Sequence, residues 1–169
     1  GNVLTDGEVQ GLVSLAAEYK IPLILDNAYG LPFPGMIYTE ATPIWNEHII
    51  LCLSLSKFGL PATRTGIVIA NKEIIRLLSG LNAVVNLAPG SFGAMLVSDL
   101  MQSGEIIRVS KEIIRPFYRD KMERALAALR HSFQGLNYKV HVPEGSMFFW
   151  LWLPGLSISS QELYTRLKH

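Results

Sequence analysis

Two side chains that could do chemistry follow short apolar runs of the chain. Asp26 comes directly after the run 21–25, and Lys57 comes four residues after the run 49–53. Continuous apolar runs of this length are typical of strands covered on both faces in a parallel sheet. Ligands of open α/β sheets bind at the edge where the strands end. We therefore expect the carboxylate and the amine to face one site, although they lie far apart in the sequence.

A carboxylate and a lysine at one site have a specific chemical use. A lysine amine forms a Schiff base with an aldehyde, and a carboxylate beside a pyridine nitrogen keeps that nitrogen protonated. Pyridoxal phosphate (PLP) requires both. The plainer interpretation is that Asp26 caps a helix and Lys57 is a solvated loop residue, and the pair alone does not decide between the two.

The residues around Lys57 favour the cofactor. Ser54 and Ser56 precede it, and Arg64 follows within an R-x-G sequence. Hydroxyl groups and a guanidinium fork are donors that suit a phosphate. An S-x-S-K sequence alone is a weak signal. Followed by R-x-G, and preceded by a strand that ends in D-N-A-Y, it becomes a specific one.

Four separated segments resemble, in order, the motifs of class I/II PLP-dependent aminotransferases. They span nearly the whole chain and comprise residues 1–5, 26–29, 54–66 and 143–150. A further set resembles more narrowly the members of that family that transfer amino groups between valine and pyruvate. This set comprises residues 26–35, 51–57, 115–118 and 149–152.

The resemblance implies a role for each candidate site residue. Lys57 would hold PLP covalently and then move a proton between the substrate Cα and the cofactor. Asp26 would pair with the pyridinium nitrogen, and Tyr29 would hydrogen-bond the ring oxygen and so tune the Schiff-base pKa. The phosphate would be bound by Ser54, Ser56 and Arg64. Of these three, Ser56 could instead point away from its neighbour.

The pattern of elements predicts an α/β fold. Strands alternate with helices up to about residue 103, which predicts part of a PLP-binding large domain over 1–103, with a mostly parallel sheet and flanking helices. Helical spacing then predicts a connecting stretch over 104–134, kinked or broken at Pro116. Two strands joined by a turn predict the start of an α+β small domain over 135–169. Strands are expected at 21–25, 49–53, 66–70, 138–142 and 147–153, and helices at about 6–20, 72–81, 91–101 and 105–133.

Composition excludes several classes of partner. The 169 residues carry a net charge of +1, which gives no electrostatic reason to expect nucleic acid or a membrane surface. No apolar run approaches the roughly 18 residues of a membrane span. The histidines lack metal-ligand spacing, and a single cysteine fits a reducing, cytoplasmic setting. The chain starts without Met, so we expect a piece of a longer protein that is inactive alone.

The resemblance implies a homodimeric transaminase in the intact protein. It would move an amino group between an aliphatic amino acid, such as valine or alanine, and a 2-oxo acid, such as pyruvate or 2-oxoisovalerate. Three alternatives stay open, because the motifs concern the cofactor more than the substrate. One is another PLP reaction on the same fold, such as β-elimination or decarboxylation. Another is an aminotransferase-like effector domain of a transcription regulator, and the third is a structural relic of the fold that no longer binds PLP.

Overall fold

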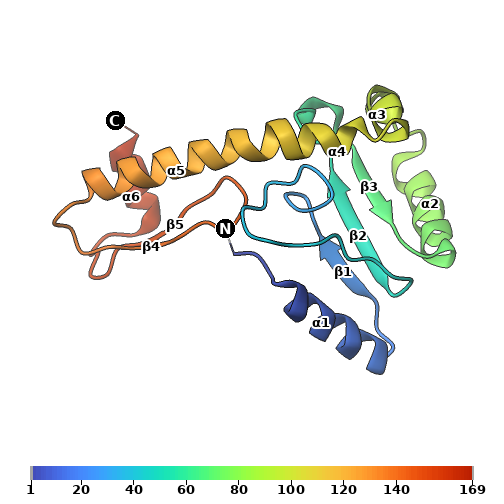
Figure 1. Cartoon of the computed structure of the whole chain (residues 1–169), viewed down its shortest axis with the longest axis horizontal. Helices are drawn as coiled ribbons and strands as arrows, with labels where there is room; N and C mark the ends of the chain where they lie inside the picture. Colours follow the sequence, from blue (N-terminus) through green and yellow to red (C-terminus); the bar gives the residue numbers. More distant parts are fainter. Residues whose placement is uncertain (1, 169) are drawn as a thin grey trace.

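A three-stranded sheet lies in the N-terminal part of the protein, on one side of the molecule (Figure 1), whose computed structural model describes residues 2–168. Its strand order is β1 (Leu23–Asp26), β2 (Ile49–Ser54) and β3 (Gly66–Ile69). β1 runs parallel to β2, whereas β3 runs antiparallel to it. The described part of the sheet is therefore mixed, with one parallel and one antiparallel pairing. The short link between β2 and β3 holds only one 3-10 turn, η1 (Pro61–Thr63), and a parallel partner needs a longer crossover.

The hydrophobic core lies on one face of this sheet. β2 alternates between buried and partly exposed side chains, and its buried members face the core. Helix α1 (Asp6–Glu18) packs Val13 against that core. As the sequence predicts, α1 begins with a capping box between Thr5 and Glu8. The buried core residues are Phe33, Ile49, Leu51, Leu53, Leu55, Val97 and Ile106.

The other face of the sheet is open. Ile24 in the middle of β1 is 62% exposed, and Val68 of β3 is 40% exposed. The expectation that the run 21–25 is covered on both faces is therefore wrong. β1 is an edge strand of the described sheet, and the described helices and loops pack on the opposite face. An apolar run alone does not reveal whether the chain itself supplies both layers.

Two helices follow the sheet. Helix α2 (Lys72–Asn86) begins where the Asn71 side chain accepts a hydrogen bond from the Ile74 N–H, and it runs five residues beyond the expected end at 81. Gly80 lies within the helix without ending it, and the next proline is Pro89. α2 has no buried residue. Helix α3 (Phe92–Gln102) matches its expected range within one residue and buries Val97 in the core.

A single long helical stretch runs from the sheet to the C-terminal elements (Figure 1). It consists of α4 (Glu105–Val109), a π-helical turn η2 (Ser110–Ile114) and α5 (Arg115–Ser132). The irregularity expected at Pro116 is present as this π turn, but the helix does not break. Pro116 lies inside this continuous stretch, and the wider π turn directly before it accommodates the proline ring and its missing N–H.

The C-terminal part contains a two-stranded antiparallel sheet and a short helix. These are β4 (Lys139–His141), β5 (Trp150–Trp152) and α6 (Ser160–Leu167). Both strands are shorter than expected. Gly1 and His169 lie outside the described residues. The division into units at 103 and 134 stays a prediction. Among residues 2–168, no helix combines the length and the apolar character needed to cross a bilayer.

Candidate active site

The C-terminal ends of β1 and β2 lie side by side. Asp26 is in register with Cys52, and the Asn27 N–H donates to the Cys52 carbonyl over 2.8 Å. Side chains alternate along a strand, so Asp26, Cys52 and Ser54 share the open face of the sheet while Leu51 and Leu53 point into the core. The Asp26 side chain is exposed. Because the alternate positions of both strands are covered by the core, the Asp26 carboxylate and the Ser54 hydroxyl lie together on the accessible face of the sheet.

Lys57 lies in a tight turn directly after β2. Leu55 is fully buried and anchors this turn, because its carbonyl accepts from the N–H groups of Phe58 and Leu60, each over 3.1 Å. The Lys57 Nζ lies 5.3 Å from the centroid of the Tyr29 ring. The amine and the phenol that the sequence singles out are therefore neighbours in space.

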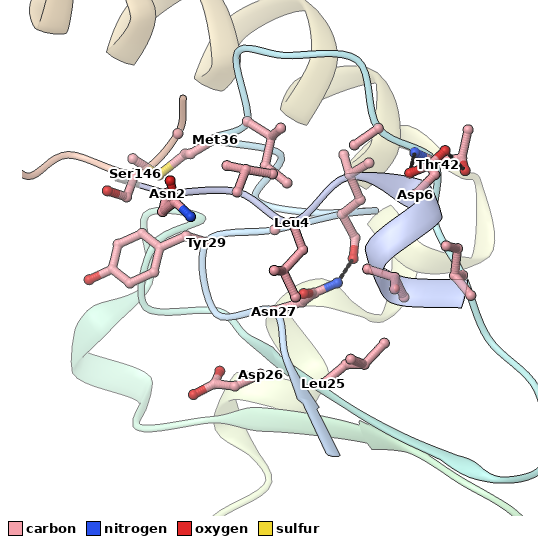
Figure 2. Close-up of a pocket in the computed structure, with 18 of the residues that line it drawn as sticks. Asn2, Leu4, Asp6, Leu25, Asp26, Asn27, Tyr29, Met36, Thr42 and Ser146 are labelled. Atoms are coloured by element: carbon pink, nitrogen blue, oxygen red, sulfur yellow. Dashed lines mark hydrogen bonds between the residues drawn. The ribbon is translucent and has the colours of Figure 1, made fainter. Parts of the chain in front are cut away.

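The loop after β1 fixes Tyr29. The Asn27 side-chain amide donates to the Leu31 carbonyl over 3.0 Å and closes the loop. A Cβ on Gly30 would lie 2.8 Å from the Asn27 Cγ, so this tight turn requires glycine. Figure 2 shows the side chains of Asp26 and Tyr29 pointing to the same side. The loop thus brings the phenol to the side that the carboxylate faces.

A cavity of about 540 Å³ opens beside these two residues. It lies between α1, the edge of β1 and the turn at 145–148 (Figure 2), and both Asp26 and Tyr29 line it. Lys57 does not line it, although it contacts Tyr29. Ser54, Ser56 and Arg64 are also absent from the lining. The candidate residues therefore share one edge of the sheet without all facing one enclosed pocket.

The candidate phosphate ligands come from two neighbouring turns. The Ser54 Oγ accepts from the Ser56 N–H over 3.2 Å, which leaves the Ser54 hydroxyl hydrogen free to donate elsewhere. Arg64 ends η1 in a left-handed conformation with φ of 48°. This is an unfavourable region for a residue with a side chain, and such strain often occurs at functional sites. Within residues 2–168, neither a hydrogen bond nor an ion pair engages the Arg64 side chain.

Helix α3 supports the Arg64 turn. A Cβ on Gly93 would collide with the Thr65 hydroxyl and would lie 3.0 Å from the Thr63 Cβ. The Leu55 N–H donates to the Thr65 carbonyl over 3.2 Å. Glycine at 93 therefore lets α3 press this turn against the end of β2. The sequence offered no local signal for this contact, because a lone glycine in an apolar helix has many uses.

Phe148 is a further residue that the sequence did not single out. Its ring packs edge-on against the Tyr29 ring, with the centroids 5.8 Å apart and the planes at 72°. The segment 143–150 suggested only the entry to a second unit. An aromatic residue directly after the turn was the available signal, but the sequence did not give its partner.

The donor set fits PLP in chemical terms. An amine, a carboxylate and a phenol lie at one sheet edge, and hydroxyl groups with a guanidinium lie on the adjoining turns. Partial burial, with a smaller contribution from the Asp26 charge, raises the pKa of the Cys52 thiol. The Cys52 thiol beside Asp26 is therefore kept in its neutral form. Residues 2–168 contain no cluster of His, Cys, Asp or Glu able to hold a metal ion.

Comparison with known proteins gives consistent relatives. Residues 1–168 match the family described as aminotransferase class I and II. The chain is 44% identical to the valine–pyruvate aminotransferase of Escherichia coli over 168 residues, which is 99% of the chain and 40% of that relative. A putative amino-acid aminotransferase from Psychrobacter arcticum superposes with a TM-score of 0.94 at 47% identity, covering 99% of this chain and 38% of that one.

A third relative is the valine–pyruvate aminotransferase of Salmonella typhimurium. Its structure superposes with a TM-score of 0.90 at 44% identity, over 99% of this chain and 43% of that one. The chain thus spans about two fifths of the length of these relatives. The superpositions confirm the α/β fold of PLP-dependent transferases. With a family match over residues 1–168, the chain belongs to the class I and II aminotransferases.

Proposed function

We propose that the intact protein containing this chain is a PLP-dependent aminotransferase. It would transfer an amino group between an aliphatic amino acid, such as valine or alanine, and a 2-oxo acid, such as pyruvate or 2-oxoisovalerate. The 44% identity to a valine–pyruvate aminotransferase supports this substrate class. The observation that carries the proposal is the placement of the Lys57 amine beside Tyr29, at the edge where Asp26 ends β1.

Each residue has a task in this proposal. PLP, when bound, supplies a sink for the electrons released when the substrate Cα–H bond breaks. The Lys57 amine attaches the cofactor and carries the proton that leaves and returns to Cα. The Asp26 carboxylate holds a proton on the ring nitrogen, and the Tyr29 hydroxyl donates to the ring oxygen. Ser54, Ser56 and Arg64 bind the phosphate through hydroxyl and guanidinium donors.

The proposal includes a homodimer in the cytoplasm, without nucleic acid or membrane partners. The exposed apolar face of α2 supports an extensive contact with further protein, since Leu77, Leu81 and Val84 are more than half exposed. Patches of this kind mark protein–protein contacts or surfaces covered by further parts of a chain. Sedimentation of the intact protein as an active monomer would contradict the dimer.

An amino-donor screen on the intact protein tests the proposed activity. With valine and pyruvate we expect alanine and 2-oxoisovalerate to appear in equal amounts, and we expect Lys57→Ala to abolish both. Release of ammonia or carbon dioxide instead would favour another PLP reaction. Cofactor binding without turnover on any donor, together with specific DNA binding, would favour the regulator.

A further inference from the structure

Phe148 and Lys57 both contact the same ring. The Phe148 ring meets Tyr29 in a T-shaped contact with centroids 5.8 Å apart, and the Lys57 Nζ lies 5.3 Å from the centroid of the same Tyr29 ring. Phe148 is 56% exposed, so its ring is not held by a surrounding core. The T-shaped contact with Tyr29 is therefore the packing contact of the Phe148 ring that bears on the candidate site.

Hydrogen bonds connect Tyr29 to the backbone that carries Phe148. The Tyr29 carbonyl accepts from the Met36 N–H over 3.0 Å, and the Met36 carbonyl accepts from the Ser146 N–H over 2.7 Å. The Phe148 N–H then donates to the Ser146 Oγ over 3.4 Å. The Tyr38 hydroxyl adds a bond of 2.6 Å to the Ser146 carbonyl. With the ring contact, these bonds form a closed circuit that starts and ends at Tyr29.

The turn that carries Phe148 has little freedom to move. A Cβ on Gly145 would lie 2.8 Å from the Met36 carbonyl oxygen, and the Val3 N–H donates to the Glu144 carboxylate over 2.9 Å. The backbone of the turn that carries Phe148 is therefore held by residues from distant parts of the sequence. Such a ring can hold a neighbour in one orientation, because T-shaped aromatic pairs favour a defined geometry.

We propose that Phe148 is a positioning residue for Tyr29. Its ring holds the phenol in the orientation in which the hydroxyl can reach the oxygen of the PLP ring, and so links the turn 144–148 to the cofactor site. This inference rests on the proposed function. It assigns Phe148 an effect on the cofactor that is transmitted through Tyr29, not through direct contact with substrate.

The direction of the effect follows from charge. The Tyr29 hydroxyl would stabilise a negatively charged oxygen on the PLP ring most when the Lys57 nitrogen carries no proton. A proton on that nitrogen would itself hydrogen-bond the same oxygen. Freeing the Tyr29 ring therefore favours the protonated form. The pH midpoint of the absorbance change of the bound cofactor should rise in Phe148→Leu by about half a unit, and PLP affinity should fall about 3-fold, as expected for loss of an aromatic pair.

The test compares four variants of the intact protein by absorbance titration. Phe148→Leu is matched by Phe117→Leu, since Phe117 is 54% exposed and makes its own T-shaped contact with Tyr118 at 5.2 Å. Tyr29→Phe and the double variant Tyr29→Phe with Phe148→Leu complete a cycle. Thermal unfolding of each cofactor-free protein, and KM and kcat separately, are measured alongside.

We expect the pH midpoint to rise in Phe148→Leu and to stay unchanged in Phe117→Leu. Adding Phe148→Leu to Tyr29→Phe should cause no further shift. A wild-type midpoint in Phe148→Leu, or an equal shift in the Tyr29→Phe background, would overturn the positioning role. A change in KM alone would equally overturn it. If the wild-type protein binds no PLP at all, the proposed function fails instead, so the two failures are distinguishable.

Discussion

The two faces of the three-stranded sheet are built from the same strands but have opposite roles. On one face, Leu51 and Leu53 are buried within a core that includes residues from α3 and α4. On the other, Ile24 is largely exposed, and Asp26 and Ser54 stand where a ligand could reach them. The covered face accounts for the fold of this chain, and the open face carries its candidate chemistry.

Along β2, positions that stabilise the core alternate with positions that face the candidate site. Residues of β2 alternate between the two faces, so a substitution at one position tests packing and a substitution at the next tests the site. The exposed Ile24 and Val68 also indicate that the open face is partly apolar. That surface is consistent with further protein covering it in the intact protein.

The largest expected effect is on the covered face. Leu51→Ala should lower the free energy of unfolding of the chain by about 2–5 kcal/mol, because it leaves a cavity in the core. Ile24→Ala on the open face should change it by no more than about 0.5 kcal/mol, as for other exposed positions. Urea denaturation of both variants measures the difference. Equal losses would mean that the two faces are not distinct.

A substitution at the candidate site on the open face should lower activity and leave stability nearly unchanged. Asp26→Asn in the intact protein should lower kcat about 10²–10³-fold, because an amide cannot hold the pyridinium proton by charge. Stability should stay near that of the wild type, since the side chain is exposed. Asp120→Asn on α5 is the control for a neutralised exposed aspartate. Near-normal turnover in Asp26→Asn would refute its role.

A smaller effect, on PLP affinity, is expected at Arg64, which ends the η1 turn between β2 and β3. Arg64→Ala should weaken PLP binding about 10–100-fold, as expected for hydrogen bonds to a charged group. Arg64 has a left-handed backbone, so Arg64→Gly should lose the same affinity while relieving strain. Equilibrium titration with PLP compares both with Arg119→Ala. Unchanged affinity in both variants would remove Arg64 from the phosphate site.

The smallest expected effect concerns the pH dependence of stability and involves Asp6, in the first turn of α1. The Thr42 hydroxyl and N–H donate to Asp6 and lower the pKa of its carboxyl below 3.8. A carboxyl with a lowered folded-state pKa stabilises the fold above its unfolded pKa, and that stabilisation is lost as the pH falls through the folded value. Thr42→Val should make stability fall less steeply below pH 3.8. An identical pH profile in the variant would show that this contact contributes nothing.

Local signals were sufficient for much of the fold. The capping box at Thr5, the buried strand that precedes Lys57 and the helix after Asn71 all follow from short patterns of propensity and polarity. The direction of β3 depends on the short link before it, which is too short for the crossover that a parallel neighbour needs. The exposure of β1 could not be predicted, because it depends on which layers pack against a strand and not on the strand itself.

In the candidate site, too, the sequence predicted some features and not others. The sequence predicted that Asp26 and Lys57 share a sheet edge, since strand ends of a parallel pair meet there, and β1 and β2 are parallel. It did not predict the contact of Phe148 with Tyr29 or that of Gly93 with Thr65. Both contacts join residues that are distant in sequence and meet only after the elements have packed.

We propose above all that Lys57 is the residue that holds the cofactor. Borohydride reduction of the intact protein with bound PLP fixes the cofactor to whichever amine carries it, and peptide mass spectrometry then locates the label. We expect a single label on Lys57, which lies beside Tyr29 in the structure, and none in Lys57→Ala. A label on another lysine, or fixation that persists in Lys57→Ala, would show that Lys57 is not the residue that holds PLP.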